Sequence, residues 1–149
     1  MEKEEIDESR FYPIITDISQ KNNSVIRYRL EDILVRKKED CSCGCQFLGI
    51  QKIEGKAADI IRANNENSHE ICIFPSEIYE PLLTIDGIMN YKIRQVNDQT
   101  LQIKINYDQT NLFVLSQSKV IEQEVSEAIK KICSKHSISE FEIVYSEYS

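Results

Sequence analysis

Short stretches in which apolar and polar residues alternate run through much of the chain, and this period of two predicts β-strands. The clearest example spans residues 100–107, where Leu101 and Ile103 alternate with polar positions. Residues 97–99 separate it from a similar stretch at 91–96, so the two are expected to form a hairpin. Alternation or β-branched runs predict further strands at residues 13–16, 25–30, 33–36, 47–53, 71–74 and 141–145.

A helical period appears near the end of the chain, at residues 119–135. Ser118 is expected to cap the start of this helix with its hydroxyl. A second, shorter helix is predicted to begin at Pro75 and to be cut short or kinked by Pro81. The apolar face of the longer helix comprises Val120, Ile121, Val125, Ala128, Ile129 and Ile132.

The order of these elements predicts the fold class. From residue 71 onward the chain is expected to run strand, helix, strand, strand, helix, strand, which is the ferredoxin-like βαββαβ order with both helices on one face of an antiparallel sheet. Short antiparallel strands are expected before it, while residues 1–10 and 62–70 are polar and are expected to be frayed and loop-like. The sequence therefore predicts an α+β protein, and the change in character after Gly55 divides it into residues 1–54 and 55–149.

Composition and charge narrow the function classes. With 149 residues the chain has room for one ordinary domain, or for a small domain and part of another. The 25 acidic and 18 basic residues give a net charge of -7, which argues against binding to nucleic acid or to an anionic membrane, because attraction to phosphate requires clustered cations. The longest apolar runs, such as 71–74 and 112–115, are too short to cross a bilayer. The charged first ten residues do not resemble a secretory signal, so a cytoplasmic protein is expected.

A cluster of cysteines is the candidate metal site. Three of the five cysteines, Cys41, Cys43 and Cys45, alternate with other residues in one short segment. Cysteines two residues apart are poorly placed for an unstrained disulfide, so free thiols in a reducing compartment are the simplest interpretation and metal binding is the alternative. Thiolates suit zinc or an iron–sulfur cluster, but a closed zinc site requires a fourth ligand. The candidates for that ligand are Asp40, His69 and Cys72.

Two short stretches carry a more specific signal. They read VIRYRLED at residues 25–32 and IQKIEGKAADII at residues 50–61, and the element Cys41-Ser42-Cys43-Gly44 lies between them. In this order and at this separation they resemble the adenylate-forming enzymes. The most similar branch is the group of phenylacetate–CoA ligases, capsule-biosynthesis proteins and coenzyme F-adenylating synthetases. The resemblance covers residues 11–105 and becomes weak in the final third of the chain.

The resemblance implies a two-part enzyme that uses ATP, Mg²⁺, a carboxylic acid and coenzyme A. A large domain binds ATP and the acid, and a small C-terminal lid rotates between formation of an acyl-adenylate and formation of a thioester. Residues 1–54 would be the end of the large domain and residues 55–149 the lid. Because the chain contains no glycine-rich phosphate loop and no room for an acid pocket, it is expected to be inactive by itself.

The resemblance also assigns candidate nucleotide-binding residues. Asp32 matches the family carboxylate that accepts hydrogen bonds from the ribose hydroxyls, and Tyr28 belongs to the same motif. Lys56 stands where the family has an arginine near the nucleotide, so it keeps the charge but loses the planar fork. Taken alone, Asp32 would be interpreted as a strand-end aspartate in a turn and Lys56 as a surface lysine.

Departures from the family pattern keep a second hypothesis open. Ala58 stands where the family commonly has its hinge aspartate, although Asp59 follows it, and both are carried over as hinge residues. Glu31 replaces the usual glycine of the first motif, and the catalytic lysine of the lid has no match. The alternative is therefore a non-catalytic binding or regulatory module that retains the lid scaffold, with or without bound zinc.

Overall fold

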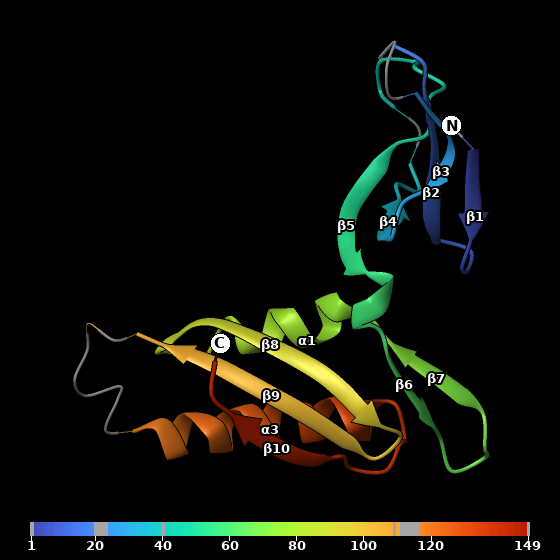
Figure 1. Ribbon diagram of the computed structural model, residues 1–149. Coiled ribbons are helices and arrows are strands. Elements are labelled where there is room, and N and C mark those ends of the chain that lie inside the picture. Colours follow the sequence, from blue (N-terminus) through green and yellow to red (C-terminus); the bar gives the residue numbers. More distant parts are fainter. Residues whose placement is uncertain (1, 20–23, 40, 109, 111–116, 149) are drawn as a thin grey trace. The chain divides into compact units, whose positions relative to one another are not determined.

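The computed structural model describes residues 2–19, 24–39, 41–108, 110 and 117–148 (Figure 1). The chain divides into two compact units, Met1–Ala58 and Asp59–Ser149. Each unit has its own strands and buries its own apolar side chains.

The N-terminal unit is an antiparallel sheet of five strands. The central strand, β2, pairs with β1 along one edge and with β3 and then β4 along the other, and β4 pairs in turn with β5. This arrangement confirms the antiparallel strands expected at this end of the chain. The strands are β1 Glu2–Glu5, β2 Arg10–Asp17, β3 Val25–Arg29, β4 Asp32–Arg36 and β5 Ile50–Lys56.

The charged start of the chain is ordered, contrary to the expectation of fraying. Residues 2–5 form β1 and pair with residues 11–14 of β2. Glu2 forms an ion pair with Arg27 at 2.6 Å, and Glu5 forms one with Arg36 at 2.7 Å. The prediction was wrong because the basic partners come from β3 and β4, which the pattern of residues 1–10 cannot reveal.

A two-stranded ribbon opens the C-terminal unit. Its strands are β6 Ile61–Asn64 and β7 Glu70–Ile73, so residues 62–64 are strand and not loop. The turn between them is closed by Asn65, whose Oδ1 accepts hydrogen bonds from the backbone N–H groups of Asn67 and His69, both at 3.0 Å. The ribbon is exposed over much of its surface, and its polar side chains obscure the strand period.

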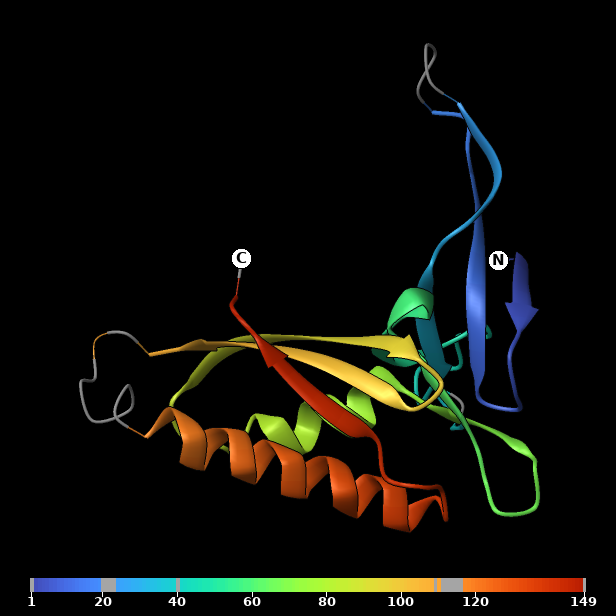
Figure 2. The same cartoon turned by 60° about the horizontal axis from the view of Figure 1, so that its bottom comes forward.

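The remainder of the C-terminal unit is a three-stranded sheet with two helices on one face (Figure 2). Leu101 and Ile103 of its middle strand are fully buried in a core that also contains the apolar faces of both helices. Removing this apolar surface from water stabilises the unit by roughly 25 cal/mol per Å². The elements are α1 Pro75–Leu82, β8 Ile88–Asn97, β9 Thr100–Tyr107, α3 Ser118–Lys135 and β10 Glu142–Ser146.

The α+β class and the order of elements are confirmed, and the pairing of the strands adds detail. The sheet is mixed, in the order β10-β9-β8, and β10 runs parallel to β9 because the chain crosses between them through α3. The strand β7 pairs with β6 and not with this sheet. Ser118 does not cap α3, since it is the first helical residue and Gln117 holds the cap position without a side-chain hydrogen bond.

The helices of the described segments are short or amphipathic. None of them is long and apolar enough to span a lipid bilayer.

Candidate functional site

Two residues of the predicted nucleotide site, Asp32 and Lys56, lie side by side. Asp32 is the first residue of β4 and Lys56 the last of β5, and the antiparallel register places their Cα atoms opposite each other. Residues directly opposite in an antiparallel pair project to the same face of the sheet. Asp32 is half-buried, Lys56 is exposed, and neither has an ion-pair partner among the described residues. The pair therefore offers a hydrogen-bond acceptor next to a cation.

A β-bulge immediately precedes Lys56. Ile33 pairs with Gly55 while Leu34 pairs with Ile53, so Glu54 is the extra residue of β5. Gly55 has a φ of 141°, a conformation that favours glycine. The bulge coincides with burial of the Glu54 side chain, since the residue is only 4% exposed.

Arg10 compensates the buried charge of Glu54. Its Nε donates to Glu54 Oε2 at 2.8 Å and its Nη2 donates to Oε1 at 3.3 Å, which is a two-point contact between a guanidinium and a carboxylate. Its Nη1 donates to Asp7 Oδ2 at 2.9 Å. Because Arg10 belongs to β2, this network ties the centre of the sheet to the strand that carries Lys56.

Asp7 gives the network a measurable pH dependence. Burial opposes ionisation of its carboxyl, but hydrogen bonds from Ser9 and Arg10 outweigh burial and lower the pKa of Asp7 to about 2. The ionised carboxylate therefore stabilises the folded unit fully above the ordinary pKa of aspartate, about 4, and this contribution is lost as the pH falls toward 2.

Titration of the Asp7 carboxyl carbon by NMR should give a midpoint of about 2 in the native chain and a higher one in Ser9→Ala. A native midpoint of about 4 would contradict the hydrogen bonds.

Tyr28, the third predicted nucleotide-binding residue, lies in the same unit and is 57% exposed. Between Tyr28 and Asp32, the carboxylate of Glu31 forms an ion pair with Arg29 at 2.7 Å. No hydrogen bond within the described part of the chain links Tyr28 to Asp32. The structure therefore brings Asp32 and Lys56 together, and the nucleotide-binding role of all three residues stays a prediction.

The predicted hinge residues occupy a single 3-10 turn, Ala57–Asp59, directly after β5. The backbone N–H of Ala57 donates to the carbonyl of Glu31 at 2.8 Å, which extends the β4–β5 pairing into the turn. The boundary between the compact units falls between Ala58 and Asp59, and the turn contains no buried residue. A change of backbone angles in this turn would disturb no buried side chain, and the hinge role of Ala58 and Asp59 stays a prediction.

The cysteine segment is an exposed turn in which two thiols touch. The Sγ atoms of Cys41 and Cys43 lie 2.8 Å apart, and the N–H of Gly44 donates to the carbonyl of Cys41 at 2.9 Å. The hydrogen bond with Cys43 lowers the pKa of the Cys41 thiol. Cys45 is exposed as well.

The described side chains do not form the ligand set of a closed zinc site. Within the described ranges, no group of three or more cysteine, histidine, aspartate or glutamate side chains is close enough together to hold a metal ion. Of the candidate fourth ligands, Asp40 lies outside the described residues. His69 and Cys72 belong to the β6–β7 region of the C-terminal unit. We therefore assign no step to zinc.

Arg10 and Glu54 were not predicted from the sequence. A glycine inside a strand pattern is a signal of a bulge, and Gly55 directly follows Glu54. The partner of Glu54 is 44 residues away and carries no signal of its own. Only the pairing of β2, β4 and β5 brings the two charges into contact.

Solved structures share the fold of this chain, whereas no family model and no curated protein matches it. Two structures of 2-hydroxyisobutyryl-CoA ligase in the postadenylation state, in complex with 2-HIB-AMP and with R3-HIB-AMP, both match with a TM-score of 0.53. Their sequences are 19% and 18% identical to it over the matched residues. Each match covers 91% of this chain and 28% of the ligase chain. The chain thus has the fold of part of 2-hydroxyisobutyryl-CoA ligase and spans less than a third of the length of that chain.

Proposed function

We propose that residues 1–54 are the end of the large domain of an ATP-dependent, AMP-forming acyl-CoA ligase-like enzyme, and that residues 55–149 are its lid. The observation that carries this proposal is the pairing of Asp32 with Lys56 across the ends of β4 and β5. The two residues come from separate stretches of sequence, and each stretch resembles a motif of the adenylate-forming enzymes. The fold shared with 2-hydroxyisobutyryl-CoA ligase supports the proposal.

The chemistry of the residues suits a bound nucleotide. In the proposal, the Asp32 carboxylate accepts hydrogen bonds from both ribose hydroxyls, because its two oxygens can serve neighbouring donors at once. The Lys56 ammonium attracts the phosphate as a single point charge. Tyr28 adds its exposed ring to the nucleotide site, and the lid rotates about Ala58 and Asp59.

The complete enzyme would activate a carboxylic acid. The carboxylate oxygen attacks the α-phosphorus of ATP, the bond to the β-phosphate oxygen breaks, and pyrophosphate leaves with its Mg²⁺. The acyl-adenylate then reacts with the thiol of coenzyme A and releases AMP. The rest of the large domain would supply the acid pocket and the triphosphate site. The two motifs and the Cys41-Ser42-Cys43-Gly44 element support placement in the phenylacetate–CoA ligase and capsule-biosynthesis group. A cytoplasmic location is part of the same proposal.

Substitution of Asp32 tests the nucleotide role in the polypeptide that carries the complete large domain. Asp32→Ala removes two charge-assisted hydrogen bonds of about 1.5–3 kcal/mol each, so kcat/KM for ATP should fall by about 100-fold or more. The matched control is Asp86→Ala, which removes an exposed carboxylate in the turn before β8 and should leave kcat/KM unchanged. Equal activity of the Asp32 variant and the native enzyme would exclude the ribose contact.

The size of the native polypeptide separates this proposal from a second candidate, a binding module without catalysis. That alternative is favoured by Glu31, which stands where the first motif of the adenylate-forming enzymes usually has glycine. An immunoblot of source cells with antibodies against this chain would show a band several times larger if the chain is part of a complete ligase. A band at the chain's own mass would favour the binding module.

A further inference from the structure

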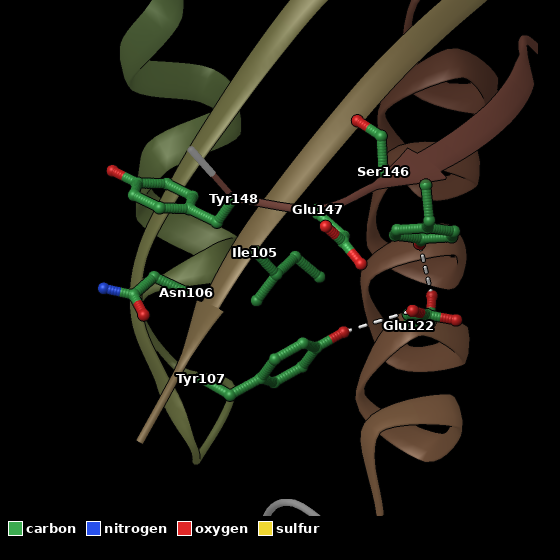
Figure 3. A pocket seen from close by; sticks show the side chains of 8 residues that line it. Ile105, Asn106, Tyr107, Glu122, Ser146, Glu147 and Tyr148 are labelled. Atoms are coloured by element: carbon green, nitrogen blue, oxygen red, sulfur yellow. Dashed lines mark hydrogen bonds between the residues drawn. The ribbon is translucent and has the colours of Figure 1, made fainter. Parts of the chain in front are cut away.

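A pocket of about 540 Å³ opens on the C-terminal unit (Figure 3). It lies where the end of β9, the first half of α3 and the residues after β10 meet. Ile105 borders the pocket but is only 5% exposed, so its apolar lining is chiefly the rings of Tyr107, Tyr145 and Tyr148. The polar lining comes from Asn106, Glu122, Glu147 and the tyrosine hydroxyls. None of the described lining residues is basic.

Two carboxylates give the pocket its charge. In Figure 3 the side chains of Glu122 and Glu147 point toward the same space as the hydroxyl of Tyr107. Tyr107 donates to Glu122 Oε1 at 3.2 Å. Neither carboxylate has a cationic partner among the described residues. An ionised carboxylate has about four acceptor positions, so most of the acceptor capacity here is open.

Tyr107 adds no charge to the pocket but presents a ring surface. Burial and the neighbouring Glu122 raise the pKa of Tyr107 to about 12, so its hydroxyl remains protonated at neutral pH. The hydroxyl of Tyr145 is held by the backbone carbonyl of Glu122 at 2.5 Å and by Ser126 Oγ at 2.9 Å. These bonds fix the Tyr145 ring beside the pocket.

The ring of Tyr148 already attracts a cation. The Nζ atom of Lys92 lies 5.0 Å from its centroid, within the range of a cation–π contact. The face of an aromatic ring is negative, so aromatic rings and carboxylates select for the same sign of charge. The surface of the tyrosine rings also suits an alkyl chain better than a bare metal ion, which would require more oxygen ligands.

We propose that this pocket binds a small alkyl diamine, with one primary ammonium group donating hydrogen bonds to Glu122 and the other lying near Glu147. A primary ammonium has three donors and can use the open acceptor positions of a carboxylate, whereas a quaternary ammonium cannot. The alkyl chain between the two charges covers the ring of Tyr107. All residues of the pocket belong to the C-terminal unit, whereas Asp32 and Lys56 belong to the N-terminal unit.

Titration of the native chain with 1,4-diaminobutane tests this inference. At low salt, two-dimensional amide NMR spectra should show saturable shifts confined to residues 105–107, 122–126 and 145–148. Neutral 1,4-butanediol has the same length without the charges and should produce no such shifts. Absence of saturable shifts up to millimolar diamine, or shifts spread over all acidic surfaces, would overturn the proposal.

Glu122→Gln and Glu124→Gln form a matched pair of variants for the same titration. Both remove one negative charge from α3, but Glu122 lines the pocket and Glu124 lies in the groove between α1 and α3. Glu122→Gln keeps an acceptor for Tyr107 and should weaken diamine binding by about fivefold or more, while Glu124→Gln should change it by less than about twofold. Equal weakening in both would show attraction to the net charge alone and would overturn the site. The dispersion of the amide spectrum confirms that each variant is folded.

Discussion

Arg10→Met is expected to destabilise the N-terminal unit by about 3 kcal/mol, because it leaves the carboxylate of Glu54 buried without its guanidinium partner. Breaking a buried ion pair on one side costs about 3–5 kcal/mol in general. The lower end applies here, since the side chain of Glu54 is 1% exposed but that of Arg10 is 26% exposed. Lys52, 3.8 Å from Glu54, can compensate only part of the loss. Native-state hydrogen exchange of amides in β2 and β5 should report the change, while amides of β8 and β9 should keep their protection.

The control for Arg10 is Arg27→Met, the same substitution at an exposed ion pair. Arg27 and Glu2 lie 2.6 Å apart, but their side chains are 66% and 53% exposed. Such pairs contribute about 0–1 kcal/mol, so exchange in the N-terminal unit should change little. If the two variants lost equal protection, Glu54 would behave as a surface carboxylate and its buried pairing with Arg10 would be disproved.

Leu101→Ala is expected to destabilise the C-terminal unit by about 3–5 kcal/mol, through lost apolar burial and the cavity that remains. Leu101 is 0% exposed and lies in β9, the middle strand of the sheet, within the core that α1 and α3 complete. Both helices belong to this unit, so the helical circular dichroism signal during urea unfolding reports its stability. The midpoint should move to clearly lower urea with an unchanged slope.

Leu83→Ala is the matched control for this core substitution. Leu83 follows the end of α1 and is 62% exposed, so the same loss of atoms leaves no cavity. Its effect should stay within about 0.5 kcal/mol. A similar loss in both variants would show that the apolar core does not depend on Leu101.

Segments with a strong local period were predictable from the sequence. The strand β9 occupies residues 100–107 as predicted, and α3 begins one residue before the predicted start at 119 and ends at the predicted residue. In both, the apolar positions repeat at the period of the element, and they pack in the core apart from Val120 in the first turn of α3, which is 49% exposed. The strands β1 and β6 were missed, because their polar residues are stabilised by partners from other strands or face solvent.

The candidate site was predictable only as a set of residues. The motifs contained Asp32 and Lys56, but their pairing depends on the register of β4 and β5, including the bulge at Glu54. The packing of α3 against the sheet likewise decides the contact of Tyr107 with Glu122. No spacing along the chain indicates that the side chains of Tyr107 and Glu122 lie within hydrogen-bond distance.

The amino-acid sequence by itself determined the α+β class, the order of the elements and the acidic composition, because these depend on local periodicity and on totals of residues. It also contained the two motifs that resemble adenylate-forming enzymes. The tertiary structure alone decided the mixed sheet with β10 parallel to β9, the Arg10–Glu54 pair and the pocket at the end of β9. These features arise from strand register and helix packing, which bring together residues distant in sequence and therefore leave no local pattern.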